Sequence, residues 1–427
     1  MRHRKWFGML AGFVLLCFLI GLCGIRSDRP VDKSTLGKFS FQTGTADVNV
    51  RPADGSPMTA GNQKWIAASS DRGPDWEQIE PISFFNRPSP RTDARIRPDL
   101  LLVPGGESIG VKLNTRGVLV VGYHLVDSAE GQASPGESAG IHIGDVITKI
   151  NGKQMVSIRD IRQVITDSRG GTPVRLTVLR QQTLLDKKLV PVRDRNNLHY
   201  QLGLYIRDSA SGIGTMTFYD PKTSSYGALG HVISDRDTGQ PIRIREGSIV
   251  RSTVQAIERG SEGKPGEKIA YFPDNALSIG SVDKNTPFGI YGHLQGNYGA
   301  RSAGERKAIP IALADQVREG PAQILTVLDG NKVQAFDIKI LNSVPQKYPA
   351  TKGLVIKITD PRLLKATGGI IQGMSGSPII QDGKLVGAVT HVFVSDPTSG
   401  YGVHIEWMLQ EAGLAAYQKN HLKQAAG

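Results

Sequence analysis

The stretch that decides the fold is Gly373-Met374-Ser375-Gly376-Ser377-Pro378. A serine hydroxyl is a weak nucleophile, so acyl transfer needs it on a sharp turn beside backbone donors for the oxyanion. Small residues suit such a turn: Gly376 relieves it, and Pro378 directs the exit into a strand. We therefore predict that Ser375 is a nucleophile and that the N–H groups of Gly373 and Ser375 form an oxyanion hole.

The residues after the hexapeptide predict a hairpin. Within 379–390, apolar β-forming residues flank Asp382-Gly383, a dipeptide that favours a type I′ turn. Trypsin-like serine peptidases continue in this way after their serine, and the chain resembles them here. The alternative is a serine-bearing surface turn in some other β-protein.

The composition bounds the fold class and the partners. A chain of 427 residues is long enough for two domains with their own cores, and 50 Gly with short apolar runs favour a mainly β barrel or sandwich. The net charge is +12, but the basic residues are scattered and are not interleaved with aromatic residues in a patch. This pattern favours an anionic membrane surface or an acidic partner over nucleic acid.

Residues 1–25 predict a signal anchor. The twenty residues 6–25 carry no charge, and they follow the basic run at 2–5. A helix of that length spans about 30 Å, the thickness of a bilayer's hydrocarbon core. The basic flank should stay in the cytoplasm, so the rest of the chain is expected to be exported. A cleaved signal peptide is the alternative, although no clear A-x-A site follows.

The cysteines restrict the chemistry. Cys17 and Cys23 are the two cysteines of the chain, and both lie in the predicted anchor. The exported part therefore has no disulfide, no Cys nucleophile and no Cys-based metal site, and no His-Glu-x-x-His motif occurs. We expect chemistry by Ser, His and carboxylates, with no metal or other cofactor.

Residues 26–98 predict a flexible spacer, because they are polar, rich in Pro and Gly turns and without sustained periodicity. The apolar patch Ile82-Ser83-Phe84-Phe85 is a candidate docking or cleavage point. Accessible segments of this kind are cut easily, so we expect proteolysis here, including self-cleavage.

Residues 99–193 resemble a PDZ domain. The segments 139–147 and 150–152 match the central pattern of that family, and 157–168 predicts an amphipathic helix. Residues 106–111 resemble the loop and strand that hold a peptide, which predicts peptide binding by Ser108, Ile109, Gly110 and Val111. The ligand could be another protein's tail or the chain's own spacer. The alternative is a PDZ fold that only packs against its neighbour.

Residues 194–427 contain many short strands with Gly turns and predict the barrel domain. A nucleophilic serine needs a base within hydrogen-bond reach. Of the nine histidines, His231 lies among small residues at a predicted strand end, upstream of Ser375. We predict that His231 is the base. His293 is the runner-up, and His391, in the strand after the serine, is expected to be packed or half-exposed.

The carboxylate that would orient the base is less well defined by the sequence. Asp360 closes an apolar strand shortly before Ser375, and we predict that it is the acid. Asp235, Asp274 and Asp283 are alternatives. Each of the four could equally be a turn residue, which is a common role of Asp near Pro or Gly.

The whole pattern closely resembles the stage IV sporulation protein B family, the SpoIVB serine peptidases of endospore-forming bacteria. The resemblance rests on the basic anchor, the PDZ-like region, the Ser375 hexapeptide and the stretches 211–218 and 228–231. It implies three regions in order: an N-terminal membrane helix, a PDZ-like domain and a trypsin-like double β-barrel peptidase domain. It also implies that Ser375, His231 and Asp360 are the nucleophile, base and acid.

The resemblance further implies a signalling role in sporulation. Such a peptidase is made in the forespore as a single-pass membrane protein and is exported into the space between the forespore and mother-cell membranes. It cleaves itself near its N-terminus and is released. It then cleaves a membrane-embedded regulatory complex, which triggers pro-sigma-K processing.

Two other functions are compatible with the sequence. The first is an exported PDZ adaptor whose barrel is an inactive peptidase scaffold. The second is a general envelope quality-control protease, although the HtrA type carries its PDZ domains after the protease domain.

Overall fold

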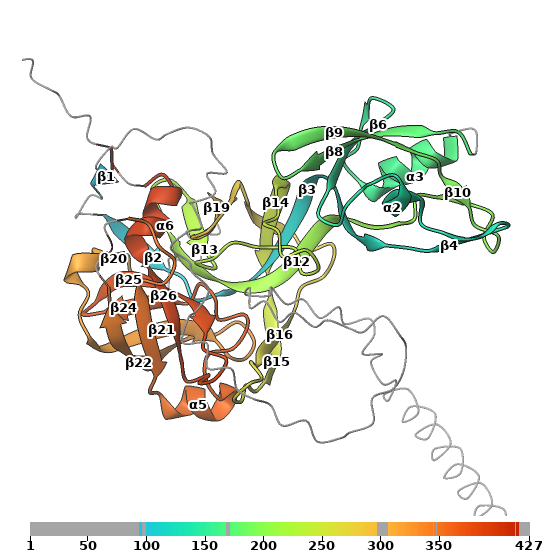
Figure 1. The fold of residues 1–427 in the computed structure, drawn as a ribbon. Helices are drawn as coiled ribbons and strands as arrows, with labels where there is room; N and C mark the ends of the chain where they lie inside the picture. Colours follow the sequence, from blue (N-terminus) through green and yellow to red (C-terminus); the bar gives the residue numbers. More distant parts are fainter. Residues whose placement is uncertain are drawn as a thin grey trace, which may run out of the picture. The chain divides into compact units, whose positions relative to one another are not determined.

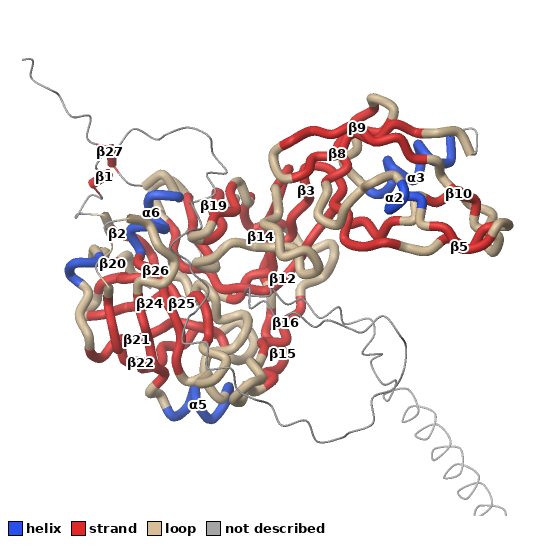
Figure 2. Tube along the Cα trace, viewed as in Figure 1, coloured by secondary structure: helices blue, strands red, loops and turns tan. Residues whose placement is uncertain are grey.

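The computed structural model describes residues 94–95, 100–167, 171–296, 306–344, 346, 348–414 and 416–417. These residues form a mainly β structure, as the composition predicts (Figure 1, Figure 2). The predicted anchor and nearly all of the predicted spacer lie outside the described residues. In the described part, none of the helices has the length and apolarity needed to cross a bilayer.

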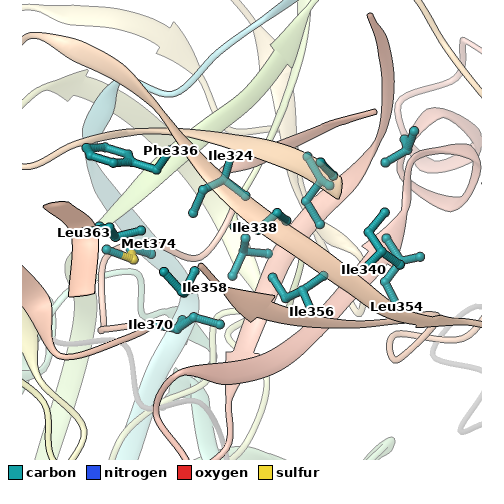
Figure 3. Packing of buried hydrophobic residues seen from close by; sticks show 14 of the residues in the cluster. Ile324, Phe336, Ile338, Ile340, Leu354, Ile356, Ile358, Leu363, Ile370 and Met374 are labelled. Carbon is teal, nitrogen blue, oxygen red and sulfur yellow. The ribbon is translucent and has the colours of Figure 1, made fainter. Parts of the chain in front are cut away.

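The C-terminal strands close into a six-stranded barrel in the order β21-β22-β23-β26-β25-β24. Its core follows from alternation along the strands: in β22, Phe336, Ile338 and Ile340 are buried, whereas Asp337 and Lys339 are exposed. Figure 3 shows these apolar side chains packed together inside the barrel. The strands are β21 (Gly320–Val327), β22 (Val333–Ser343), β23 (Leu354–Ile358), β24 (Pro378–Gln381), β25 (Lys384–Val392) and β26 (Ser399–His404).

The hairpin predicted after the hexapeptide is present. β24 and β25 pair antiparallel, and the turn between them has φ 50° at Asp382 and φ 72° at Gly383. Positive φ at both central residues is what a type I′ turn requires. Two short helices accompany the barrel, α5 (Pro361–Thr367) and α6 (Ile405–Glu411), the second burying Ile405, Met408 and Leu409.

A second six-strand set precedes the barrel. Pairing gives the order β17-β14-β3-β12-β13-β19, and an isolated bridge between Gly280 and Leu294 brings β17 back to the end of β19. The sheet therefore curls around its own core, which includes Ile109, Val111 and Met216. The strands are β3 (Ser108–Tyr123), β12 (Leu204–Tyr219), β13 (Ser225–Ala228), β14 (Ile244–Arg251), β17 (Ser278–Ser281) and β19 (Gly289–His293), with β18 (Lys284–Thr286) paired to β19.

Short elements connect the two strand sets. β2 pairs with both β12 and β20, and β15 pairs with β16 in a separate hairpin. Their bounds, with those of the 3₁₀ helix and the terminal pair, are β1 (Ala94–Arg95), β2 (Leu101–Pro104), β15 (Thr253–Glu258), β16 (Glu267–Tyr271), β20 (Ile309–Pro310), η2 (Ala314–Gln316) and β27 (Ala416–Tyr417).

The PDZ region uses the remaining halves of β3 and β12. The second half of β3 pairs with β6, which continues the sheet through β8 and β9, and α3 buries Ile161 and Ile165 against it. The amphipathic helix predicted for this region is therefore confirmed. The elements are β4 (Val126–Ser128), β5 (Gly131–Ala133), α2 (Pro135–Ser138), β6 (Val146–Ile150), β7 (Lys153–Gln154), α3 (Ile158–Asp167), β8 (Val174–Arg180), β9 (Thr183–Leu189), β10 (Val192–Arg193) and β11 (Tyr200–Gln201).

The structure differs from the predicted division into 99–193 and 194–427. β3 pairs with β12 from Ser108 to Tyr123, and its first half also pairs with β14. The PDZ region is thus inserted between two neighbouring strands of the six-strand set that precedes the barrel: the chain leaves that set after the first half of β3 and returns to it in the second half of β12. Because these partners lie about a hundred residues apart in the chain, local sequence patterns do not reveal the insertion.

The prediction that Ser108, Ile109, Gly110 and Val111 bind a peptide is wrong for the same reason. These residues pair with β12 on one side, and residues 109–111 pair with β14 on the other. A peptide can add only to a strand that has a free edge. The space above Gly110 is also filled, because a Cβ atom there would lie 2.5 Å from the Phe272 ring.

We expect Gly110→Val to destabilise the protein. The added side chain overpacks the Phe272 ring, which should cost about 1–3 kcal/mol in the free energy of unfolding. Urea denaturation of the single variants and of Gly110→Val with Phe272→Leu measures the coupling between the two positions. An unchanged midpoint for Gly110→Val would place residues 108–111 outside a packed sheet.

Candidate active site

The nucleophile loop adopts the turn that the sequence predicts. Gly373 has φ 90° and Gly376 has φ 93°, a region that favours glycine. A Cβ atom on Gly376 would lie 2.1 Å from the Thr215 carbonyl oxygen, so no side chain fits there. Among the described residues, the N–H groups of Gly373 and Ser375 have no hydrogen-bond partner, which leaves both for an oxyanion.

Strand β12 holds this loop in place. The Thr215 N–H donates to the Ser375 carbonyl at 3.0 Å, and the Thr215 hydroxyl donates to the Gly373 carbonyl at 2.7 Å. The Thr217 hydroxyl donates to the Gly376 carbonyl at 2.8 Å. Thr215 and Thr217 are fully buried, so these bonds are shielded from water.

His231 is tied to the same strand. The Leu229 N–H donates to the Thr215 carbonyl at 3.2 Å, two residues before the histidine. The His231 ring is 5% exposed, and its Nδ1 lies 2.8 Å from the Val232 carbonyl oxygen. A carbonyl can only accept, so Nδ1 carries the proton and Nε2 of the neutral ring keeps its lone pair. Burial lowers the pKa of His231 below its ordinary value, which favours that neutral form.

Ser375 and His231 both lie near Thr390 and His391 of β25. The Ser375 hydroxyl donates to the Thr390 carbonyl at 2.9 Å. A Cβ atom on Gly230, the residue before His231, would lie 3.0 Å from the Thr390 side chain, and the rings of His231 and His391 are 5.4 Å apart. The structure therefore brings the predicted nucleophile and base into one site.

His391 is half-buried, as its place in the strand after the serine predicts. Its Nδ1 atom is buried and has no hydrogen-bond partner within the described residues. Burial, repulsion from the His231 ring when that ring is protonated, and the Lys352 ammonium lower the pKa of His391 to about 3, so the His391 ring stays neutral.

Asp360 is not part of this site, and its prediction as the acid is corrected here. Its carboxylate caps helix α5 by accepting from the Arg362 N–H at 2.8 Å, and it pairs with the Arg362 guanidinium at 2.7 Å. These bonds hold the pKa of Asp360 at about 2. The Asp-Pro sequence at this point serves a helix start, where Asp is favoured before Pro.

The alternative residues also have other partners. His293 is exposed and pairs with Asp283 at 3.0 Å. Asp235 pairs with Arg207, and Asp274 is exposed. Among the described residues, the Val232 carbonyl is thus the partner that orients His231, and no carboxylate bonds its ring.

Sequence reasoning missed Lys268, which lies beside the oxyanion loop. Its N–H donates to the Gln372 carbonyl at 3.0 Å, and a Cβ atom on Gly373 would lie 3.1 Å from its side chain. The ammonium group is buried against the Thr326 hydroxyl at 2.6 Å, and burial lowers the pKa of Lys268 to about 7. A lysine in a polar strand carries no signal of such burial.

No group of His, Cys, Asp and Glu residues in the described part is arranged to hold a metal ion. The chemistry that this arrangement supports is attack by a serine hydroxyl on a carbonyl, with a neutral histidine beside it and two N–H groups for the oxyanion.

The PDZ region has a groove in a different place from the one predicted. A cavity of about 720 Å³ lies between α3 and the chain from Asn197 to Ile206. Ile161 and Ile165 of α3 line it together with Leu204 and Ile206 of β12. Over Leu204–Arg207, β12 pairs with β3 on one side and with no other described strand, so one edge is open to an added strand.

The sequence does carry a signal for this groove. In Leu202-Gly203-Leu204, a glycine stands between two apolar residues at the start of a strand. The same pattern led to the prediction of a peptide-binding loop at 106–111. Gly203 has φ 65°, and a Cβ atom there would lie 2.5 Å from Pro135. In this chain the segment follows helix α3, whereas the predicted order placed the peptide-binding strand before the helix.

Family models match both regions of the chain. Residues 198–409 match the family model described as SpoIVB peptidase S55, and residues 126–180 match a PDZ domain model. The Rv3671c protease from M. tuberculosis, active form, is 15% identical over 48% of this chain and 74% of that chain, with a TM-score of 0.29. The PDZ domain of an SdrC-like protein from Listeria monocytogenes is 18% identical over 21% of this chain and 87% of that chain, with a TM-score of 0.18.

The family match and the serine–histidine site together define a serine endopeptidase. The chain belongs to the SpoIVB peptidase family, S55.

We expect Asp360→Asn to affect stability more than catalysis. Because the pKa of Asp360 is lowered from 3.8 to about 2, its contribution to stability is complete above about pH 4 and is lost as the pH falls through about 2. The difference in unfolding midpoint between wild type and variant should shrink over that pH range. The rate of Ser375 labelling by a fluorophosphonate should fall far less than the roughly 10⁴-fold loss that follows removal of an orienting carboxylate. A loss of that size would restore Asp360 as the acid.

Proposed function

We propose that the protein is a sporulation signalling endopeptidase in which Ser375 is the nucleophile and His231 the base. It cleaves its own N-terminal region and then a membrane-embedded regulatory complex, which triggers pro-sigma-K processing. The observation that supports the catalytic part is that the Ser375 hydroxyl bonds Thr390 while the His231 ring lies against His391, the next residue of β25, with the unpartnered N–H groups of Gly373 and Ser375 in the same loop as the serine.

The proton path follows from the hydrogen bonds of the two residues. The Nδ1 proton of His231 is held by the Val232 carbonyl, so Nε2 is the atom that accepts the Ser375 proton. The Ser375 hydroxyl donates to Thr390 in the structure, so its side chain has to rotate toward His231 before attack. After attack, the N–H groups of Gly373 and Ser375 stabilise the oxyanion, and His231 returns the proton to the leaving amine.

A backbone carbonyl is a weaker partner for a histidinium ion than a carboxylate, because it carries a dipole and no net charge. We infer that this peptidase is a slow catalyst in comparison with enzymes that have a carboxylate in this position. A slow enzyme suits a signal that is produced once, at a defined stage.

The proposed location rests on the N-terminal sequence and on the family resemblance. The uncharged segment at 6–25 behind a basic run supports a single-pass anchor with the catalytic part exported. The resemblance implies that the membrane is that of the forespore and that the catalytic part lies in the intermembrane space. The polar, Pro-rich spacer supports self-cleavage and release, because an extended segment fits a protease site without unfolding a domain.

The α3–β12 groove supports selective recognition by the PDZ region. Its open strand edge and apolar lining suit an extended peptide with apolar side chains, from a partner's tail or from the spacer. This selectivity favours a signalling protease over a general quality-control protease, which has to accept many unfolded chains.

We expect the full chain to shorten with time and the Ser375→Ala and His231→Gln variants to stay intact. Ser377→Ala is the matched control: its hydroxyl lies in the same loop and is buried with no partner among the described residues, so its loss should not affect processing. Mass spectrometry of each purified protein gives the sites and the rates.

The same proteins separate the three functions. If Ser375→Ala is processed like the wild type, the enzyme is not acting on itself through this serine, and the adaptor interpretation gains. If the wild type degrades unfolded casein as readily as the regulatory complex, the quality-control interpretation replaces the signalling one.

A further inference from the structure

Arg207 and Asp208 are adjacent residues of β12 whose side chains bond to two different parts of the structure. The Asp208 carboxylate accepts from the N–H of Ile158 at 2.8 Å, and Ile158 is the first residue of the groove helix α3. The Arg207 guanidinium pairs with Asp235 and, at 2.6 Å, with Asp237. Both aspartates lie in the turn that follows His231. Two neighbouring residues therefore connect the peptide groove to the segment of the base.

The turn after His231 is held as a unit. The Asp235 side chain is 1% exposed and accepts from the N–H groups of Asp237 and Thr238. The Asp235 N–H donates to the Gln240 carbonyl, and an isolated bridge joins Ser234 to Pro241. Because the turn is closed by its own bonds, a displacement of Asp235 would be shared by the turn 234–241, which begins three residues after His231.

β12 itself is irregular at this point. Its register against β3 shifts between Tyr205 and Ile206 and again between Arg207 and Ser209. The second shift places Thr115–Val118 of β3 opposite Asp208 alone. Bulges of this kind bend a strand locally and re-aim the side chains next to them. The open edge at Leu204–Arg207 ends at Arg207, the residue that pairs with the turn after His231. A strand added to this edge would therefore contact the irregular segment of β12 directly.

We propose that Arg207 is a positioning residue for His231 and that an extended peptide bound in the α3–β12 groove changes the reactivity of Ser375 through it. The inference rests on the proposed function of Ser375 and His231. A peptide that pairs with β12 and packs on α3 contacts Arg207's own strand and the helix that Asp208 caps. A ligand changes the geometry of a site only if it binds one conformation of the protein more tightly than another. Because the peptide contacts both β12 and α3, its affinity would depend on how these two elements are arranged. Couplings of this kind typically change rates or affinities by about 5- to 150-fold.

The test places a known group in the groove instead of relying on an unidentified peptide. Thr166 lines the groove on α3 and is exposed, so Thr166→Cys, in a chain with Cys17→Ser and Cys23→Ser, can be modified with N-benzylmaleimide and the product checked by mass. Lys153→Cys, on β7 outside the groove lining, is the matched control. The readouts are the rate at which a fluorophosphonate labels Ser375 and the amide hydrogen exchange of residues 232–242.

We expect modification at position 166 to change the labelling rate by about fivefold or more and to alter exchange in 232–242, and modification at position 153 to do neither. Both effects should vanish when Arg207→Met is added. Because Arg207→Met alone leaves the buried Asp235 unpaired, the double variant Arg207→Met with Asp235→Asn removes both charges and keeps the comparison valid if the single variant unfolds.

Unchanged labelling and exchange after modification at 166 would overturn the inference, as would an effect that persists without Arg207. If Ser375 labels in no variant, the proposed function fails. In that case the exchange of 232–242 still decides whether the groove and the His231 turn are coupled.

Discussion

The structure depends on one set of hydrogen bonds, those by which Thr215 of β12 holds the nucleophile loop. One threonine donates from its N–H to Ser375 and from its hydroxyl to Gly373, and its carbonyl accepts from Leu229, close to His231. The Ser375 loop and the segment of His231 lie about 140 residues apart in the chain, and Thr215 bonds both segments, the second through Leu229. The glycines at 373 and 376 make these approaches possible, because a Cβ atom on Gly376 would collide with the Thr215 carbonyl. The geometry of the site therefore depends on β12 as well as on the loop itself.

The same strand explains how the PDZ region is built into the peptidase. The first residues of β12 line the peptide groove, Arg207 and Asp208 follow them, and Thr215 near the other end of the strand bonds the Ser375 loop. The insertion leaves the strand set that precedes the barrel intact, because β3 and β12 still pair with each other next to the insertion. The consequence is a binding region and a catalytic centre that share a backbone strand, with no flexible linker between them.

How much the sequence predicts depends on how local each feature is. The Ser375 turn and the Asp382-Gly383 hairpin could be predicted because their signals lie within a few residues. The prediction of His231 as the base rests on the small residues around it and on the family resemblance, and the structure shows that it lies near the strand that bonds Ser375. The peptide site could not be placed, because whether Ser108–Val111 have a free edge depends on β12 and β14, whose pairing leaves no local trace. The prediction of Asp360 as the acid was wrong for a related reason. An Asp before Pro also occurs at helix starts, and the contact with Arg362 shows that Asp360 caps a helix here.

If Thr215 positions the Ser375 loop, Thr215→Val should slow the reaction of Ser375, because this change removes the hydroxyl that bonds Gly373 and keeps the shape of the side chain. Thr148→Val is the control: the Thr148 hydroxyl donates to the Thr177 carbonyl at 2.9 Å in the PDZ region, a bond of the same kind away from the site. The measurement is the rate of Ser375 labelling by a fluorophosphonate at urea concentrations where all three proteins are folded. We expect a loss of about tenfold or more for Thr215→Val, since the removal of one oxyanion donor elsewhere costs about 10²–10³, and no change for Thr148→Val. Equal labelling rates for the wild type and Thr215→Val would show that Thr215 does not position the loop.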